Sequence, residues 1–186
     1  KDDFEQELAE LGSLRAKADA ITSKLTRSIS AKYQENPAYY DSFSKRIKEA
    51  LEQYKEKVVS EAEYLAKMRT IMEDYYAGKS TVTYPEAIKN NVHAQAFYGV
   101  LSAVFDNEKE VKVSSDFVAE VAEEVTKIVA NHSQVDWTSN KAIHDRISQD
   151  IDDLFYDYEK KRGLKLSFDT IDKIIENVKT VALRRF

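Results

Sequence analysis

The sequence predicts an all-α protein, an array or bundle of about seven to eight helices joined by short connections. Apolar residues recur every three or four positions along most of the chain, which is the period of helices that bury one face. Only four glycines and two prolines occur among the 186 residues, far fewer than a turn-rich β protein needs. No run of alternating apolar and polar residues predicts a strand, because residues 111–113 are too few.

A long first helix is predicted over residues 4–33. Gly12 lies inside its apolar stripe and costs about 1 kcal/mol relative to Ala, which allows a bend or short break there. The pattern ends near Asn36 and Pro37, residue types that suit the cap and the first turn of a following helix. The stripe comprises Leu8, Leu11, Leu14, Ala18, Ile21, Leu25 and Ile29.

The next two helices follow from the same spacing and from a capping motif. Ser60 and Glu63 have the spacing of a capping box, in which a hydroxyl and a carboxylate satisfy free amides at a helix start. This helix is expected to end at Gly78, a natural left-handed cap. Residues 79–84 are predicted to form a loop before Pro85 opens another helix. The stripe before the capping box comprises Phe43, Ile47, Leu51, Tyr54 and Val58.

The second half of the chain predicts the remaining helices. Residues 88–104 form one helix or two short ones, followed by a charged connector at residues 106–110. Ser114 or Ser115 caps the helix that follows. Its buried face is expected to comprise Phe117, Val121, Val125 and Ile128.

The last two helices have clear boundaries. Thr138 or Ser139 is predicted to cap the first of them, which stops at Gly163. Ser167 starts the second. The inward residues of the second are expected to be Phe168, Ile171, Ile175, Val178 and Ala182.

Composition excludes several classes of protein. Hydrophobic residues make up 42% of the chain and aromatic residues 11%, which excludes disorder throughout. The absence of cysteine excludes a disulfide scaffold, a thiolate nucleophile and cysteine-ligated zinc, and it fits a reducing compartment. No apolar run approaches the length of a membrane span. The chain begins Lys1-Asp2-Asp3, neither an initiator methionine nor a signal peptide, so we expect a piece of a longer protein.

Two short motifs superficially suggest catalysis. Residues 78–80 (Gly-Lys-Ser) match the end of a phosphate-binding loop, but Glu73 stands where that motif needs its first glycine. Residues 110–112 (Glu-Val-Lys), with Asp106 upstream, resemble the acidic-x-Lys arrangement of metal-dependent nucleases, yet they fall in a connector between helices. A helix cap and a solvated loop are the favoured interpretations.

The histidines do not predict a metal site. His93, His132 and His144 lie far apart and have no histidine partner three or four residues away. We expect His144 to be an exposed helical residue. The sequence therefore predicts no catalytic, cofactor-binding or metal-binding residue in this chain.

Basic clusters and tyrosines are the remaining candidates for binding. Cations near a helix C-terminus are favoured by the helix dipole alone, so a contact with phosphate or with an acidic partner is the more specific alternative. Tyrosines beside the helical stripes favour core packing, with a partner surface as the second interpretation. The net charge of −5 repels duplex DNA unless the positive charges are clustered. The candidate contacts are Lys160, Lys161, Arg162 and Lys165, with Arg184 and Arg185 at the last helix end.

Trp137 and Thr138 are predicted to be structural. The indole can cover the junction between the helices on either side of it, while Thr138 caps the second helix.

Four segments of the second half follow one another in a distinctive order. They are residues 96–101 (Ala-Phe-Tyr-Gly-Val-Leu), the helix 116–132, residues 135–138 (Val-Asp-Trp-Thr) and residues 147–154. Together they resemble the C-terminal helical module of the restriction, or motor, subunit of type I restriction enzymes. The hydrophobic-Asp-Trp-Thr step before a helix is the most specific element, and the resemblance covers about residues 40–186.

The resemblance implies a division of the chain and a role. Residues 1–35 would be a long N-terminal helix approaching from upstream motor domains, and residues 36–186 the C-terminal helical interaction domain. The parent would be a cytoplasmic, ATP- and Mg²⁺-dependent site-specific deoxyribonuclease of a bacterium or archaeon, with its catalytic domains outside this chain. The module would dock the motor subunit onto the modification (methyltransferase) subunit and meet DNA only through the complex.

The alternative is a helical module that contacts nucleic acid through its basic helix ends. The helix after Trp137 often looks basic in relatives, but here it is acidic, which favours a protein partner. Its aspartates are Asp145, Asp150, Asp152, Asp153 and Asp157.

Overall fold

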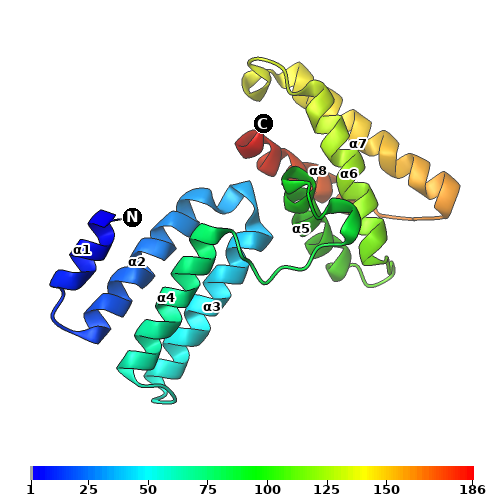
Figure 1. Cartoon of the computed structure of the whole chain (residues 1–186). Coiled ribbons are helices and arrows are strands. Elements are labelled where there is room, and N and C mark those ends of the chain that lie inside the picture. Colours follow the sequence, from blue (N-terminus) through cyan, green and yellow to red (C-terminus); the bar gives the residue numbers. More distant parts are fainter. Residues whose placement is uncertain (1) are drawn as a thin grey trace. The chain divides into compact units, whose positions relative to one another are not determined.

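The computed structural model describes residues 2–186 and confirms the predicted all-α class (Figure 1). Lys1 lies outside the described residues. The described chain contains eight α-helices, three short 3-10 helices and no strand. No helix in this part is long and apolar enough to cross a membrane. The α-helices are α1 (Asp2–Glu10), α2 (Leu14–Lys32), α3 (Pro37–Lys55), α4 (Glu61–Ala77), α5 (Val92–Asn107), α6 (Ser115–His132), α7 (Lys141–Arg162) and α8 (Phe168–Arg185).

The chain divides into two compact units. The N-terminal unit extends to Tyr33 and includes Tyr39–Val82, and the C-terminal unit comprises Gln34–Ala38 and Thr83–Phe186. The predicted boundary between residues 35 and 36 is therefore not the boundary between the units. The physical reason is that α2 packs along α4, so the first helices share a core with α3 and α4. The approach of residues 1–35 from upstream motor domains stays a prediction.

The helix predicted over residues 4–33 is two helices, and the break falls at Gly12, where the sequence allows one. α1 ends before Leu11, and α2 begins after Ser13, whose side chain accepts a hydrogen bond from the Ala16 amide at 3.0 Å. Gly12 is unfavourable within a helix and Ser13 is a good N-cap, so a new helix start is favoured at this point.

Aromatic side chains hold α3 and α4 together. Phe43 on α3 and Tyr75 on α4 meet edge to face, with ring centroids 5.3 Å apart. Tyr64 is fully buried and stacks on Tyr54 at 4.9 Å. The predicted capping box at Ser60 is confirmed, with both of its hydrogen bonds present.

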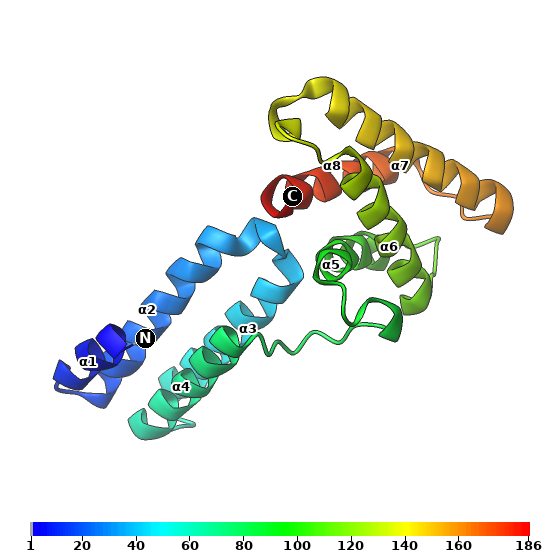
Figure 2. The same ribbon diagram turned by 45° about the horizontal axis from the view of Figure 1, so that its top comes forward.

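The C-terminal unit is built around α5, which packs against α6 and α8, while α7 packs against α6 and α8 (Figure 2). The predicted caps at Ser114 and Ser167 are confirmed, and Gly163 ends α7 in the left-handed conformation, with φ of 68°. Pro85 does not open a full helix. It precedes a single 3-10 turn (Glu86–Ile88), because Asn91 then caps α5 through the Ala94 amide.

The predicted inward face of the last helix is confirmed at Ile175, Val178 and Ala182 and is wrong at Phe168. Phe168, expected in the core, is 87% exposed. As the first residue of α8 it follows the cap Ser167, and the buried face of the helix begins at Thr170. The buried residues of α8 are Thr170, Ile174, Ile175, Val178, Val181 and Ala182.

Candidate functional site

Trp137 lies in the connection between α6 and α7 and is buried, with 3% of its surface exposed. It begins a 3-10 turn (Trp137–Ser139) and belongs to the core of the C-terminal unit. Its ring meets the His144 ring edge to face at 5.6 Å, and its carbonyl accepts a hydrogen bond from His144 Nε2 at 3.0 Å. The indole Nε1 is buried and finds no hydrogen-bond acceptor in the described structure. Trp137 thus links this connection to α7 through its contacts with His144.

The predicted capping role of Thr138 is wrong. Asp136 adopts the left-handed conformation, with φ of 62°, and turns the chain into the 3-10 helix that contains Thr138. The helix α7 therefore starts later, and Asn140 is its N-cap, accepting a hydrogen bond from the Ala142 amide at 3.1 Å. Thr138 is exposed.

The two capping candidates differ in expected effect on stability. We expect Asn140→Ala to lower the free energy of unfolding by about 1 kcal/mol, because it removes the partner of an otherwise free amide. Thr138→Ala, the matched control, is expected to change it by less than about 0.5 kcal/mol. Urea unfolding of both variants measures the difference, and equal losses would contradict the assignment of the cap.

Arg162 is tied to the fold. It donates to both carboxylate oxygens of Glu120 on α6, at 2.7 and 2.9 Å. Its guanidinium also lies over the rings of Phe117 and Tyr158, 5.4 and 5.5 Å from their centroids. Burial, together with the charges of Glu120 and Glu124, raises the pKa of Tyr158 to about 12. Arg162 therefore links α7 to α6 and is not a free cation.

The other predicted contact residues are exposed and lie at the end of α7 and in the connection that follows it. Lys161 pairs with Asp157 one turn earlier, at 2.9 Å. The Lys160 ammonium lies 4.4 Å from the centroid of the Tyr156 ring. Lys165 stands in the connection between α7 and α8. Lys160 and Lys161 thus each contact a side chain of α7 itself.

At the second predicted basic helix end, the C-terminus of α8, Arg185 contacts other residues of the chain. Arg185 donates to the Glu35 carbonyl at 3.0 Å and to His93 Nδ1 at 3.3 Å. Burial and the Arg185 charge lower the pKa of His93. Arg185 therefore holds the residue 34–38 segment within the C-terminal unit.

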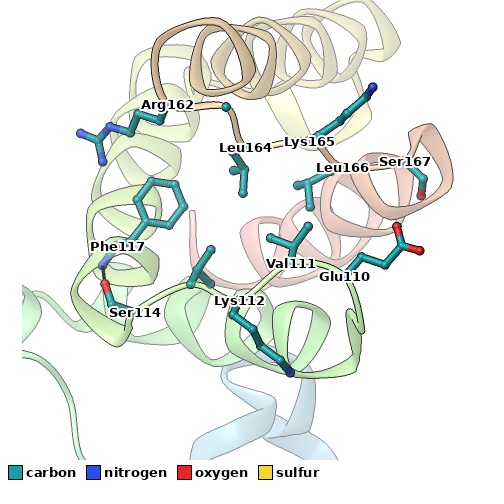
Figure 3. Close-up of a pocket in the computed structure, with 12 residues that line it drawn as sticks. Glu110, Val111, Lys112, Ser114, Phe117, Arg162, Leu164, Lys165, Leu166 and Ser167 are labelled. Carbon is teal, nitrogen blue, oxygen red and sulfur yellow. Dashed lines mark hydrogen bonds between the residues drawn. The ribbon is translucent and has the colours of Figure 1, made fainter.

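A cavity of about 710 Å³ opens between the α5–α6 connection and the α7–α8 connection (Figure 3). We call it the loop cavity. Apolar side chains from both connections point into it, whereas Lys112 and Lys165 point away. Glu110 and Lys112 thus occupy a loop at the rim of an apolar cavity, not a strand. The apolar lining comprises Val111, Val113, Phe117, Leu164 and Leu166.

A second cavity, of about 460 Å³, lies between α7 and α8. We call it the acidic groove, because it combines apolar residues with four carboxylates. The apolar lining comprises Phe155, Tyr156, Leu164, Leu166, Phe168 and Ile171. The carboxylates are Asp152, Asp153 and Glu159 from α7 and Asp172 from α8.

The remaining motifs and histidines have structural roles. Gly78 is the left-handed cap of α4, with φ of 72°. His132 Nε2 lies 2.6 Å from Asp150 and links α6 to α7, and His144 is partly buried under Trp137 rather than exposed. Among residues 3–186, no three side chains of His, Asp or Glu converge so that they could hold a metal ion.

The described part of the chain is thus all-α, and its C-terminal unit carries the loop cavity and the acidic groove. Over residues 1–182, the sequence matches the family described as Type I restriction enzyme HindI endonuclease subunit-like, C-terminal. The chain belongs to this family, and the predicted resemblance is confirmed at that level. No curated protein and no solved structure matches the chain.

Proposed function

We propose that this chain is the assembly module at the C-terminal end of a type I restriction endonuclease subunit. It docks the ATP-dependent DNA translocase and nuclease onto the modification (methyltransferase) subunit. Family membership over residues 1–182 is the observation that carries the proposal, because it assigns the chain to the C-terminal region of an endonuclease subunit. Two cavities with apolar linings at the surface of the C-terminal unit support a protein partner.

In this proposal, the reaction chemistry belongs to other parts of the endonuclease subunit. ATP hydrolysis and Mg²⁺-dependent cleavage need converging carboxylates and a phosphate-binding loop. Neither of the two short motifs supplies these groups. Gly78 caps α4, and the two residues after it lead out of the helix, whereas residues 110–112 form a loop. We also infer a cytoplasmic location, because the DNA and the modification subunit are found there.

Complex formation tests the proposal. The purified chain is mixed with the modification subunit at micromolar concentration and separated by gel filtration. We expect a complex that elutes ahead of both components. Two separate peaks, with the chain shown to be folded by its helical circular dichroism, would contradict the proposal.

Nucleic-acid contact is the alternative function, and the side-chain geometry favours the protein partner over it. Arg162 and Lys161 already pair with carboxylates of this chain, and the net charge of −5 opposes a polyanion. Binding of duplex DNA by the chain alone, with an affinity that falls steeply with salt, would support the alternative.

A further inference from the structure

The acidic groove exposes aromatic surface that the fold does not use. Phe168 is 87% exposed and Tyr156 is 56% exposed. Both line the groove, together with Leu164 and Leu166 of the connection between α7 and α8. Apolar side chains gathered around a cavity, with charged residues at its rim, are typical of surfaces that bind another protein.

The charged residues that line the groove are all acidic. None of the lining residues, all within the described chain, is lysine or arginine, whereas four are acidic. Partial burial raises the pKa of Asp152, and the neighbouring carboxylates of Asp172 and Asp153 add to the effect. Because Asp152 is on α7 and Asp172 on α8, the two helices bring like charges together across the groove. A cation placed between them would relieve this repulsion.

The chain itself shows how a cation can bind at the edge of the groove. The Lys160 ammonium lies over the Tyr156 ring, 4.4 Å from its centroid, on the surface of α7. An aromatic face of this kind attracts ammonium and guanidinium groups. The groove therefore offers carboxylates for cations and an apolar floor for aliphatic side chains.

We propose that the acidic groove docks an amphipathic segment of the modification subunit that carries apolar residues flanked by Lys or Arg. The groove between two helices suits a helical segment, whose apolar face would cover Phe168 and Leu166. Its basic residues would pair with Asp152 on one side and Asp172 on the other. This inference rests on the proposed function for the identity of the partner, and on the groove itself for the chemistry.

A synthetic amphipathic helix of leucine and lysine tests the chemistry without the modification subunit. We expect it to bind the chain in a fluorescence-anisotropy titration, and Phe168→Ala to weaken binding about tenfold. Val135→Ala is the matched control, because Val135 is 90% exposed in the same unit but away from the groove. Equal binding by both variants, or no binding by the unsubstituted chain, would overturn the inference.

Charge-reversal variants distinguish binding in the groove from general attraction to an acidic protein. The double variant Asp152→Lys/Asp172→Lys is expected to lose its affinity for the peptide of leucine and lysine. It is expected to bind instead an analogue with Glu in place of Lys. Asp106→Lys, an exposed position on α5, is the control for charge alone and should leave the preference unchanged. If the double variant still prefers the peptide with lysine, the assignment of the binding site to the acidic groove is contradicted.

The same variants, mixed with the modification subunit, identify the partner. We expect Phe168→Ala and the double variant to weaken the complex about tenfold or more while both controls retain it. If all variants bind the modification subunit equally, docking occurs elsewhere, and the groove inference fails while the proposed function stands. If the unsubstituted chain does not bind this subunit, the proposed function fails, and with it the partner assigned to the groove.

Discussion

Trp137→Ala is expected to lower the free energy of unfolding by about 3–5 kcal/mol. The indole is 3% exposed and packs into the core of the C-terminal unit, so its removal leaves a cavity between α6 and α7. The variant also removes the edge-to-face contact with His144. Urea unfolding followed by circular dichroism measures the change.

Trp137→Phe separates packing from polarity at this position. Phenylalanine keeps an aromatic ring in the core and removes an indole N–H that finds no acceptor in the described structure. Because an unpaired buried donor is itself unfavourable, we expect a loss of only about 1–2 kcal/mol. An unchanged stability of Trp137→Ala would contradict the structural role of Trp137 and would point to an exposed indole.

Gly99→Ala is expected to destabilise the chain although alanine is the better helix former. A Cβ atom at Gly99 in α5 would lie 2.6 Å from the Ala38 Cβ, a distance that forces one of the two backbones to move. Overpacking costs about 1–3 kcal/mol and alanine's propensity offsets about 1 kcal/mol, so we expect a net loss of up to about 2 kcal/mol. Both residues lie in the C-terminal unit, so the contact measures how tightly residues 34–38 pack there.

A double-mutant cycle shows whether the close approach is the cause. Ala38→Gly removes the opposing Cβ and should recover most of the stability lost in Gly99→Ala. Gly12→Ala is the matched control, because nothing lies within 4 Å of the Cβ that it introduces, and we expect it to be neutral or slightly stabilising. No recovery in the double variant would mean that Gly99 is required for another reason.

The helices could be predicted from the sequence because local signals specify them. The spacing of apolar residues and the caps at Ser60, Ser114 and Ser167 depend only on neighbours within one turn. The start of α7 was missed because Thr138, Ser139 and Asn140 are all acceptable caps. The left-handed backbone at Asp136 decides among them, and sequence alone does not show it.

The acidic groove could not be predicted, because its two sides come from different helices. Asp152 and Asp172 are twenty positions apart, and only the packing of α7 against α8 brings them to one cavity. The spacing of the stripe predicts Phe168 in the core, but the first residue of a helix has no preceding turn to fix its face, and Phe168 is exposed. The acidic character of residues 145–157 was the one available signal for the chemistry of the partner.

A competition experiment tests most directly the proposal that this chain holds the endonuclease subunit onto the modification subunit. The complex of the complete endonuclease subunit with the modification subunit is incubated with increasing concentrations of the purified chain, and its amount is followed by analytical ultracentrifugation. We predict that the folded chain displaces the complete subunit and that Phe168→Ala does so only at about tenfold higher concentration. A complex that persists unchanged at a large excess of folded chain would contradict the claim.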